Sequence, residues 1–287
     1  MIALAGRRTV LALVLLAIGL GVWSTAFEPQ RLTVQRAEIT LPHWPRELDG
    51  ITLALISDVH GGAPYVSVLK LRELVALTNA ERPDLVFLLG DYVIQGVLGG
   101  RFMPPETTAR ELGGLRARLG RFAVLGNHDH WLDAARVSAA FEAATIPVVD
   151  GKRVRLVDNG RALSILGLGD AWTVRPDVGA VTRQIPEGEA ALLLTHNPDV
   201  FPSIPASVDL VLAGHTHGGQ IALPWIGALI VPARRAYARG HVVEGGRHLF
   251  VTSGVGTSII PVRFRVPPEI ALVRLRAPSV GETMPAR

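Results

Sequence analysis

The chain of 287 residues contains no cysteine. This absence excludes disulfide-stapled folds, thiolate zinc sites, iron–sulfur clusters and cysteine nucleophiles. Lysine is almost as scarce, because only Lys70 and Lys152 occur and nearly all of the positive charge comes from arginine. The net charge of +4 is small and scattered, without long runs of like charge, so no nucleic-acid partner is expected. Any bound metal must therefore be held by His, Asp, Glu, Asn or Gln.

Charged residues are also missing from Thr9–Phe27, directly after Arg7-Arg8. About 19 residues of helix span roughly 29 Å, which is close to the thickness of the hydrocarbon core of a bilayer. Residues 1–27 therefore predict a membrane anchor, with Trp23 at the interface. The alternative is a cleaved signal peptide, because Ser24-Thr25-Ala26 are small and Arg7-Arg8 resembles a weak twin-arginine signal. Either segment brings the chain to the cell membrane, so membrane lipid is an expected partner.

The arginines around this segment bear on its orientation. Basic residues near a first span are retained on the cytoplasmic side, and Arg7-Arg8 lies directly before the apolar stretch. We therefore expect the remainder of the chain outside the cytoplasm. Arg31, Arg36 and Arg46 follow the stretch and favour the opposite orientation.

The rest of the chain divides into three parts by composition. Residues 28–50 carry three prolines and an alternating pattern at Leu32–Thr40, which predicts a connecting segment with an edge strand or hairpin arm. Residues 51–276 carry the recurrent apolar runs of a folded domain. Residues 277–287 form a tail.

Within 51–276, five short apolar runs each end at side chains that can bind metal. Runs that are apolar throughout predict strands buried on both faces, covered by helices or by a second sheet. Two stripes at helical spacing lie between them, with Asp133 as a candidate N-cap of the second stripe. The runs and the polar residues that follow are Ile51–Ile56 with Asp58 and His60, Leu85–Leu89 with Asp91, Phe122–Leu125 with Asn127, His128 and Asp129, Ala191–Leu194 with His196, and Leu210–Ala213 with His215 and His217; the stripes are Val68, Leu71, Leu74 and Val75, and Val137, Ala140, Phe141 and Ala144.

Taken singly, each of these polar residues has a structural alternative, such as a turn for Asp91 or a satisfied core histidine for His196. Their recurrence at five successive strand ends instead favours a metal centre. Imidazole, carboxylate and amide donors together suit Mn, Fe, Zn or Co better than Ca or Mg, which prefer all-oxygen shells. The seven expected ligands divide into two sites for two divalent transition-metal ions and are Asp58, His60, Asp91, Asn127, His196, His215 and His217.

In their order along the chain, these motifs resemble the five blocks of the calcineurin-like metallophosphoesterases, from about Ile51 to Leu275. The resemblance implies an α/β fold, a four-layer sandwich of two mixed β-sheets flanked by helices, here preceded by an N-terminal hydrophobic helix. It also implies a dinuclear centre at the strand ends. Its motifs here are Asp58-x-His60, Gly90-Asp91, Gly126-Asn127-His128-Asp129, Thr195-His196 and Gly214-His215-x-His217.

The same resemblance assigns roles to the residues. Asp58, His60 and His217 would hold one ion. Asn127, His196 and His215 would hold the second, with Asp91 bridging the two. His128 would be the acid beside the leaving group. Independently of the resemblance, the adjacent Asp129 is a candidate to orient His128, although neighbouring residues often point apart. A hydroxide held between the ions would attack phosphorus in line.

Two departures from the protein-phosphatase motifs narrow the choice of subfamily within this superfamily. Protein phosphatases of this superfamily read Gly-Asp-x-Val-Asp-Arg-Gly where this chain has Gly90–Gly96, and their third block ends in Glu where this chain has Asp129, so a phosphoprotein phosphatase is not expected. The segments Asn127–Trp131, His217–Ile221 and Gly254–Ser258 resemble the bacterial membrane-associated branch. That branch includes phosphodiesterases with twin-arginine or transmembrane N-termini and enzymes that cleave the pyrophosphate bond of UDP-2,3-diacylglucosamine in lipid A synthesis.

The sequence therefore predicts a membrane-associated phosphodiesterase or pyrophosphatase acting on a phosphate ester or a lipid- or nucleotide-linked diphosphate. A nuclease of the same fold and a catalytically silent binding module are the alternatives. No obligate protein partner is evident. The loop Gly254–Thr257 is interpreted either as a tight turn or as a donor of N–H groups to an anion. Arg263 and Arg265 are interpreted either as solvated strand charges or as contacts to substrate phosphate.

Overall fold

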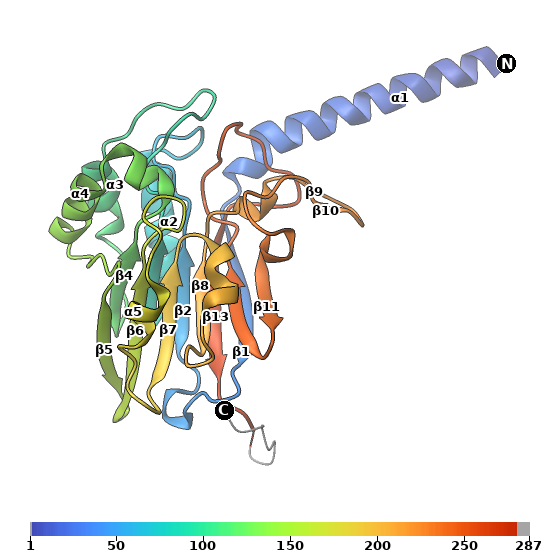
Figure 1. Cartoon of the computed structure of the whole chain (residues 1–287). Coiled ribbons are helices and arrows are strands. Elements are labelled where there is room, and N and C mark those ends of the chain that lie inside the picture. Colours follow the sequence, from blue (N-terminus) through green and yellow to red (C-terminus); the bar gives the residue numbers. More distant parts are fainter. Residues whose placement is uncertain (1, 280–287) are drawn as a thin grey trace.

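The structure, a computed structural model, describes residues 2–279, with side chains from Arg7 onward. The predicted tail therefore lies outside the described residues from position 280. Figure 1 shows helix α1 (Ile2–Val22) extending away from one end of a layered α/β body. The chain passes from α1 into that body through a π-helical turn, Trp23–Phe27, and a 3₁₀ turn, Glu28–Gln30.

The first sheet has five strands in the order β1-β13-β2-β3-β4. All neighbouring pairs are parallel except β13 with β2. The predicted edge strand within 28–50 is β1, which pairs with β13 from the far end of the chain. The strands are β1 (Thr33–Thr40), β2 (Thr52–Ile56), β3 (Leu85–Leu89), β4 (Gly120–Val124) and β13 (Glu269–Arg276).

The second sheet has six strands in the order β11-β12-β8-β7-β6-β5. Its central pairs are parallel, and the outer strands β5 and β11 run antiparallel to their neighbours. A separate short hairpin, β9 (Ala222–Leu223) with β10 (Gly227–Ala228), lies outside both sheets. The six strands are β5 (Arg153–Asp158), β6 (Arg161–Leu168), β7 (Ala190–Thr195), β8 (Leu210–Ala213), β11 (Gly240–Glu244) and β12 (Arg247–Val251).

The two sheets pack face to face, and helices cover their outer faces. Successive residues of a strand point to opposite sides, so Leu53 and Leu55 pack between the sheets while Ala54 and Ile56 pack beneath the helices. This confirms the predicted four-layer α/β sandwich and the burial of the apolar runs on both faces. The covering elements are α2 (Val68–Ala80), α3 (Pro105–Leu112) and α4 (Asn127–Ala143) on the first sheet, and α5 (Val178–Thr182) with the 3₁₀ turns Pro198–Ser203 and Arg235–Tyr237 on the second; further 3₁₀ turns are Arg46–Leu48 and His217–Gly219.

Helix α4 contains a kink at Asp133, where φ is −179° and ψ is 96°. Its Oδ1 accepts a hydrogen bond of 3.0 Å from the backbone N–H of Arg136, so Asp133 caps the second half of the helix as predicted. The helical conformation nevertheless begins earlier than the apolar stripe indicates, at Asn127. Asn127 and His128 therefore lie in the first turn of a helix that starts directly after β4.

Strands from both sheets deliver their following residues to one end of the sandwich. Asp58 after β2 lies beside His217 after β8, and Asp91 after β3 lies beside His196 after β7. The turns that follow α1 join the body at this same end (Figure 1). We call it the site end, and we call the end with Arg46–Leu48 and the C-terminus of β13 the opposite end.

Candidate metal centre

Histidines and carboxylates from four strand ends and from α4 meet at the site end. Three groups of them present ligand atoms that all lie within 4.8 Å of one another. His60 belongs to two of these groups and Asp91 to two, so the three groups form one continuous cluster. They are Asp58 with His60 and His217, Asp91 with His196 and His215, and His60 with Asp91 and His128.

The first group is held by a hydrogen bond on its far side. His60 Nδ1 lies 3.0 Å from the carbonyl oxygen of Val93, so Nδ1 carries the proton and donates. The Nε2 atom of His60 then faces His217 Nε2 at 3.2 Å. His217 Nε2 lies 3.3 Å from Asp58 Oδ1, which is buried without a hydrogen-bond partner in the described part of the chain. These atoms converge as ligands of one cation would.

The second group is arranged in the same way. His196 Nδ1 donates to the carbonyl oxygen of Leu89 at 2.7 Å, which turns its Nε2 toward the cluster. That Nε2 lies 3.1 Å from His215 Nδ1 and 3.3 Å from Asp91 Oδ2. Asn127 Oδ1 is likewise buried and has no hydrogen-bond partner among the described residues.

Asp91 lies between the two groups. Its Oδ2 is 3.3 Å from His196 Nε2, 3.7 Å from His60 Nε2 and 3.9 Å from His128 Nε2. Its Oδ1 accepts a 2.9 Å hydrogen bond from the backbone N–H of His128. One buried carboxylate oxygen therefore faces imidazoles of both groups, which is the position that a bridging ligand needs.

Burial sets the protonation of these imidazoles. It lowers the pKa of His60 to about 4 and that of His215 to about 3, so both present lone pairs at neutral pH. His196 differs: burial alone would lower its pKa, but attraction to Asp91 raises it to about 10. Burial opposes ionisation of Asp91 too, yet attraction to His196 holds the pKa of that carboxyl well below its ordinary value.

The donor set fits divalent transition-metal ions. Imidazole nitrogens face one another across 3.1–3.2 Å, and two buried oxygens, Asp58 Oδ1 and Asn127 Oδ1, have no hydrogen bond among the described residues. Buried polar groups are normally satisfied, so ligand atoms that converge in this way fit a bound cation. All seven predicted ligands come from this one end of the sandwich. Their individual roles as ligands stay a prediction.

The backbone of the cluster is strained. Positive φ is uncommon outside glycine and clusters where surrounding structure enforces it, often at functional sites. Gly90 allows the close packing behind Asp91, because a Cβ there would lie 2.6 Å from Gly126 N and 2.7 Å from His196 Nδ1. Five of the seven predicted ligands have positive φ, namely Asp58 (51°), His60 (45°), Asp91 (58°), His215 (71°) and His217 (50°).

His128 lies at the mouth of the cluster, with 13% of its side chain exposed. Its ring packs edge-on against His60 at 4.8 Å and lies 5.0 Å from Trp131. Burial lowers its pKa, and attraction to Asp91 opposes this shift. The imidazole therefore lies between the predicted metal ligands and solvent.

Asp129 does not orient His128, contrary to the prediction. Its carboxylate accepts hydrogen bonds from the backbone N–H groups of Asp91 (2.8 Å), Tyr92 (2.9 Å), Val93 (3.3 Å) and Gly126 (2.9 Å). His128 Nδ1 is buried without a hydrogen-bond partner among the described residues. Adjacent residues in the first turn of α4 point in different directions, so Asp129 faces the Asp91 loop instead. Asp129 is a positioning residue for Asp91.

Two further sequence interpretations are settled by hydrogen bonds. In the loop Gly254–Thr257, Val255 N and Gly256 N already donate to the carbonyl oxygens of Ser57 and Asp58, so these two N–H groups are not available to an anion. Arg263 is not a solvated charge and does not face substrate. It is fully buried, and its guanidinium donates to the carbonyl oxygens of Ser253, Gly254, Gly256 and Val266. Arg263 thus fastens the turn that holds Asp58, whereas Arg265 is exposed.

Asp170 and Trp172 are missed by the sequence analysis. Asp170 is fully buried after β6, and its Oδ1 has no hydrogen-bond partner among the described residues. The Trp172 ring packs edge-on against His215 at 4.4 Å. The signal is present in the sequence, since the apolar run of β6 ends at Gly169-Asp170, as that of β3 ends at Gly90-Asp91.

The geometry agrees with comparisons to known proteins. Residues 51–219, more than half of the chain, match the family model described as calcineurin-like phosphoesterase. An uncharacterized metallophosphoesterase of Bacillus subtilis (strain 168), YkuE, is 28% identical over 254 residues, covering 87% of each chain. Phosphodiesterase YaeI of Escherichia coli (strain K12) is 29% identical over 233 residues, covering 78% of this chain and 81% of its own. UDP-2,3-diacylglucosamine pyrophosphatase LpxG of Chlamydia trachomatis serovar D is 27% identical over 310 residues, covering 88% and 92%.

Proposed function

The chain belongs to the calcineurin-like phosphoesterase family and is a metal-dependent phosphoric ester or diphosphate hydrolase. From that premise we propose that it is a membrane-associated phosphodiesterase or pyrophosphatase with two metal ions at the site end. The observation that carries the proposal is the position of Asp91 Oδ2, which lies within 3.9 Å of imidazole nitrogens on both sides.

The residues divide between two ions as follows. Asp58, His60 and His217 would hold the first ion, and Asn127, His196 and His215 would hold the second. Asp91 would serve both. Two bound ions of Mn, Fe, Zn or Co would supply Lewis-acid charge and a water of lowered pKa. The protein contributes a fixed, buried donor set, so little reorganisation accompanies binding of the phosphate.

His128 supplies the proton that the leaving group needs. Its Nε2 lies 3.9 Å from Asp91 Oδ2, and that carboxylate stabilises the imidazolium form against burial. Because part of its side chain is exposed, His128 can exchange protons with solvent between turnovers. Asp129 acts indirectly, since it fixes the backbone that carries Asp91.

The names of two relatives support the substrate class. One is a phosphodiesterase and another cleaves a lipid-linked nucleotide diphosphate. We therefore assign this chain a phosphate diester or a lipid- or nucleotide-linked diphosphate. Within that class, UDP-2,3-diacylglucosamine would require the catalytic domain on the cytoplasmic face of the membrane. The activity test described below distinguishes this assignment from a nuclease and from a catalytically silent binding module.

The N-terminal segment supports the membrane role. The one candidate span within the described residues, Arg7–Gln30, contains most of helix α1, and none of its apolar window is buried against the body. We assign residues 1–27 as an anchor, 28–50 as a connecting edge segment and 51–276 as the catalytic domain. The catalytic domain lies outside the cytoplasm, because Arg7-Arg8 precedes the span. A C-terminal alkaline phosphatase fusion that is active only on export tests this orientation, and an inactive fusion in the membrane fraction would reverse it.

The activity is tested with the full-length chain in detergent, loaded with Mn²⁺. Hydrolysis of bis-p-nitrophenyl phosphate is the expected result, and its complete absence with every metal tried would favour a binding module. The same preparation is then offered a lipid-linked diphosphate, a cyclic nucleotide and single-stranded DNA. Preferred cleavage of the DNA would favour the nuclease.

A further inference from the structure

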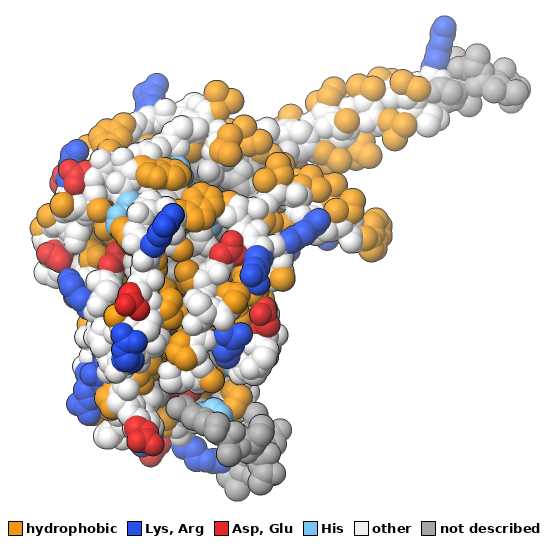
Figure 2. All heavy atoms as spheres, in the orientation of Figure 1, with side chains coloured by type: hydrophobic (Ala, Val, Ile, Leu, Met, Phe, Trp, Pro, Cys, Tyr) orange, Lys and Arg blue, Asp and Glu red, His pale blue; other side chains and the backbone are white. Residues whose placement is uncertain are grey.

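The site end carries exposed apolar side chains beside the exit of α1. The tip of the β9–β10 hairpin presents Trp225 at 102% and Ile226 at 58% of full exposure, and Ile230 follows β10 at 80%. The neighbouring loop presents Ile259 at 73%, next to Leu98 at 70%. Figure 2 shows hydrophobic side chains both along α1 and on the surface below it. Clustered exposed apolar side chains mark contact surfaces.

Hydrogen bonds join these segments into one unit. Ile221 pairs with Phe264, and Leu229 N donates to the carbonyl oxygen of Ile221. Leu98 N donates to the carbonyl oxygen of Ile259 at 2.9 Å. The hairpin and both loops therefore form a single surface, which we call the apolar rim and define by Leu98, Trp225, Ile226, Leu229, Ile230, Ile259 and Ile260.

The end of the candidate span is fastened by hydrogen bonds to the body beside the apolar rim, without a flexible linker. Arg263 N donates to the carbonyl oxygen of Ser24, and Tyr65 Oη donates to that of Thr25 at 2.7 Å. Glu28 is buried, and its carboxylate accepts from Val266 N at 2.8 Å and from Trp23 Nε1 at 2.7 Å. Figure 1 shows the β9–β10 hairpin extending from the same side of the body as α1. A membrane that receives α1 is therefore held against the apolar rim.

Charge at this end also suits a lipid surface. The segments 92–105, 210–243 and 245–268 contain no Asp or Glu. Arginine near a membrane surface is attracted to anionic headgroups by about 1 kcal/mol per residue. Trp225 has the amphipathic side chain that is enriched at membrane interfaces. The exposed arginines of these segments at the site end are Arg101, Arg234, Arg235, Arg239 and Arg265.

We propose that the apolar rim is a second membrane contact, in which the β9–β10 hairpin enters the lipid–water interface beside α1 and its arginines meet anionic headgroups. The hairpin begins at Ala222, five residues after the predicted ligand His217. Arg263, in the rim's own loop, fastens the turn that holds Asp58. The metal centre is thereby fixed next to the headgroup layer, where phosphates of lipid-embedded substrates lie. This inference rests on the proposed membrane anchoring and selects lipid-embedded over freely soluble substrates.

The absence of cysteine allows a direct test by spin labelling. Ile226→Cys and Ile259→Cys are labelled with a nitroxide in the full-length chain, in vesicles of phosphatidylcholine with a minority of phosphatidylglycerol. Val157→Cys is the matched control, because Val157 is 54% exposed on β5, outside the apolar rim. We expect the labels at 226 and 259 to be relaxed more by oxygen than by a water-soluble nickel complex, and the label at 157 to show the reverse. Using two rim positions keeps the test valid if one variant fails to fold.

Four outcomes distinguish this proposal from the proposed function and from a nucleic-acid contact. Labels at 226 and 259 that match the label at 157, in chain that floats with the vesicles, would overturn the rim contact alone. Chain that does not float would overturn the membrane anchoring. Lipid-protected labels without any hydrolysis by the metal-loaded chain would support the rim and remove the enzymatic assignment. Protection of the labels by single-stranded DNA and not by vesicles would replace the lipid surface with a nucleic acid.

Discussion

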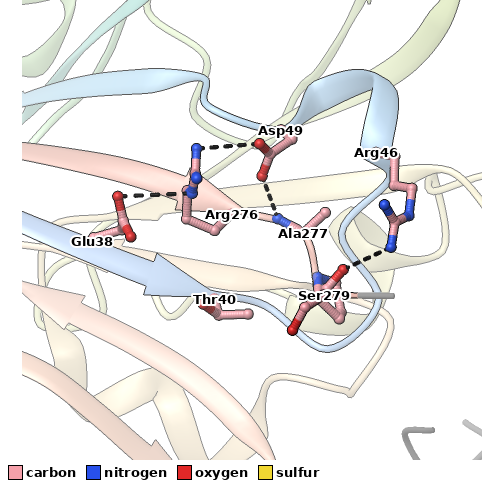
Figure 3. A pocket seen from close by; sticks show the side chains of 8 residues that line it. Glu38, Thr40, Arg46, Asp49, Arg276, Ala277 and Ser279 are labelled. Carbon is pink, nitrogen blue, oxygen red and sulfur yellow. Dashed lines mark hydrogen bonds and ion pairs between the residues drawn. The ribbon is translucent and has the colours of Figure 1, made fainter. Parts of the chain in front are cut away.

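The two ends of the sandwich differ in how their polar side chains are paired. At the opposite end, charged side chains are satisfied by one another. Arg276 lies 3.2 Å from Asp49 and 3.7 Å from Glu38 around a shallow pocket (Figure 3), and Arg118 bridges Asp84 and Asp158. At the site end, buried atoms such as Asp58 Oδ1 and Asn127 Oδ1 lack hydrogen-bond partners among the described residues.

Left-handed backbone gathers among the predicted ligands, although Arg82 and Asn159 at the opposite end also have positive φ. Five predicted ligands at the site end have positive φ, a conformation that rigid surroundings must enforce. Buried groups without hydrogen-bond partners gather where metal ligands are expected. At the opposite end, charged side chains form ion pairs with one another. The pocket of Figure 3 is therefore lined by charges that neutralise one another. Buried polar groups without hydrogen-bond partners are therefore a better guide to the candidate site than the pocket is.

Asp91→Asn should have the largest effect on metal binding and activity at the site end. The substitution removes the charge that serves both groups, so we expect both metal ions to be lost together and turnover to fall below detection. Metal analysis of the purified chain measures the first effect, and hydrolysis of bis-p-nitrophenyl phosphate the second. Asp84→Asn at the opposite end is the matched control and should keep both ions. Retention of full metal content by Asp91→Asn would contradict a shared carboxylate.

His128→Asn should separate catalysis from metal binding. We expect metal content to persist while turnover slows by about 10²–10⁴-fold, the range of a general acid. The loss should shrink for p-nitrophenol and grow for alkoxide leaving groups, because a poor leaving group needs the proton more. Equal losses for the two kinds of substrate would remove His128 from the acid role.

Much of this division can be predicted from the sequence, because its signals are local. A strand buried on both faces is apolar throughout, and a metal ligand directly after it is conspicuous, so Asp58, Asp91 and His215 could be found by inspection. The partner of β1 could not. Alternation predicts a strand at Leu32–Thr40, but pairing with β13 joins segments more than 230 residues apart.

Side-chain direction is the second limit. Asp129 and His128 are neighbours in sequence, yet the start of α4 directs the first to the backbone of Asp91 and the second to the mouth of the site. Arg263 has the type and spacing of an exposed strand residue, yet it is fully buried because four carbonyl oxygens converge on it. Hydrogen bonds of this kind, between a charged side chain and a folded loop, produce no periodic pattern in the sequence.

Asp129→Asn should weaken the site end by a smaller amount. Replacing one acceptor oxygen by an amide NH₂ turns a donor toward the backbone N–H groups of the Asp91 loop. We expect metal affinity to fall about 10–100-fold, the usual effect of losing a group that orients a ligand. Asp133→Asn, on the same helix, retains a good N-cap and should leave metal affinity unchanged. Unchanged affinity in both variants would show that Asp91 is held without Asp129.

Arg118→Gln should have the smallest effect, confined to the opposite end. Arg118 donates to Asp158 at 2.6 and 2.9 Å and to Asp84 at 2.7 Å, but 53% of its side chain is exposed. An exposed ion pair contributes about 1 kcal/mol or less, so we expect Tm to fall by roughly 2–4 °C with unchanged metal content and turnover.

The pH dependence of that loss identifies its source. The hydrogen bonds from Arg118 hold the pKa of Asp158 below its ordinary value, with burial opposing them. A carboxyl with a depressed folded-state pKa contributes stability above its unfolded-state pKa, and this contribution disappears as the pH falls through the folded-state pKa. The Tm difference between Arg118→Gln and the parent chain should therefore be full near neutral pH and vanish in acid. A difference that persists in acid would assign the loss to packing of the arginine side chain, and a simultaneous fall in turnover would show that the two ends are coupled.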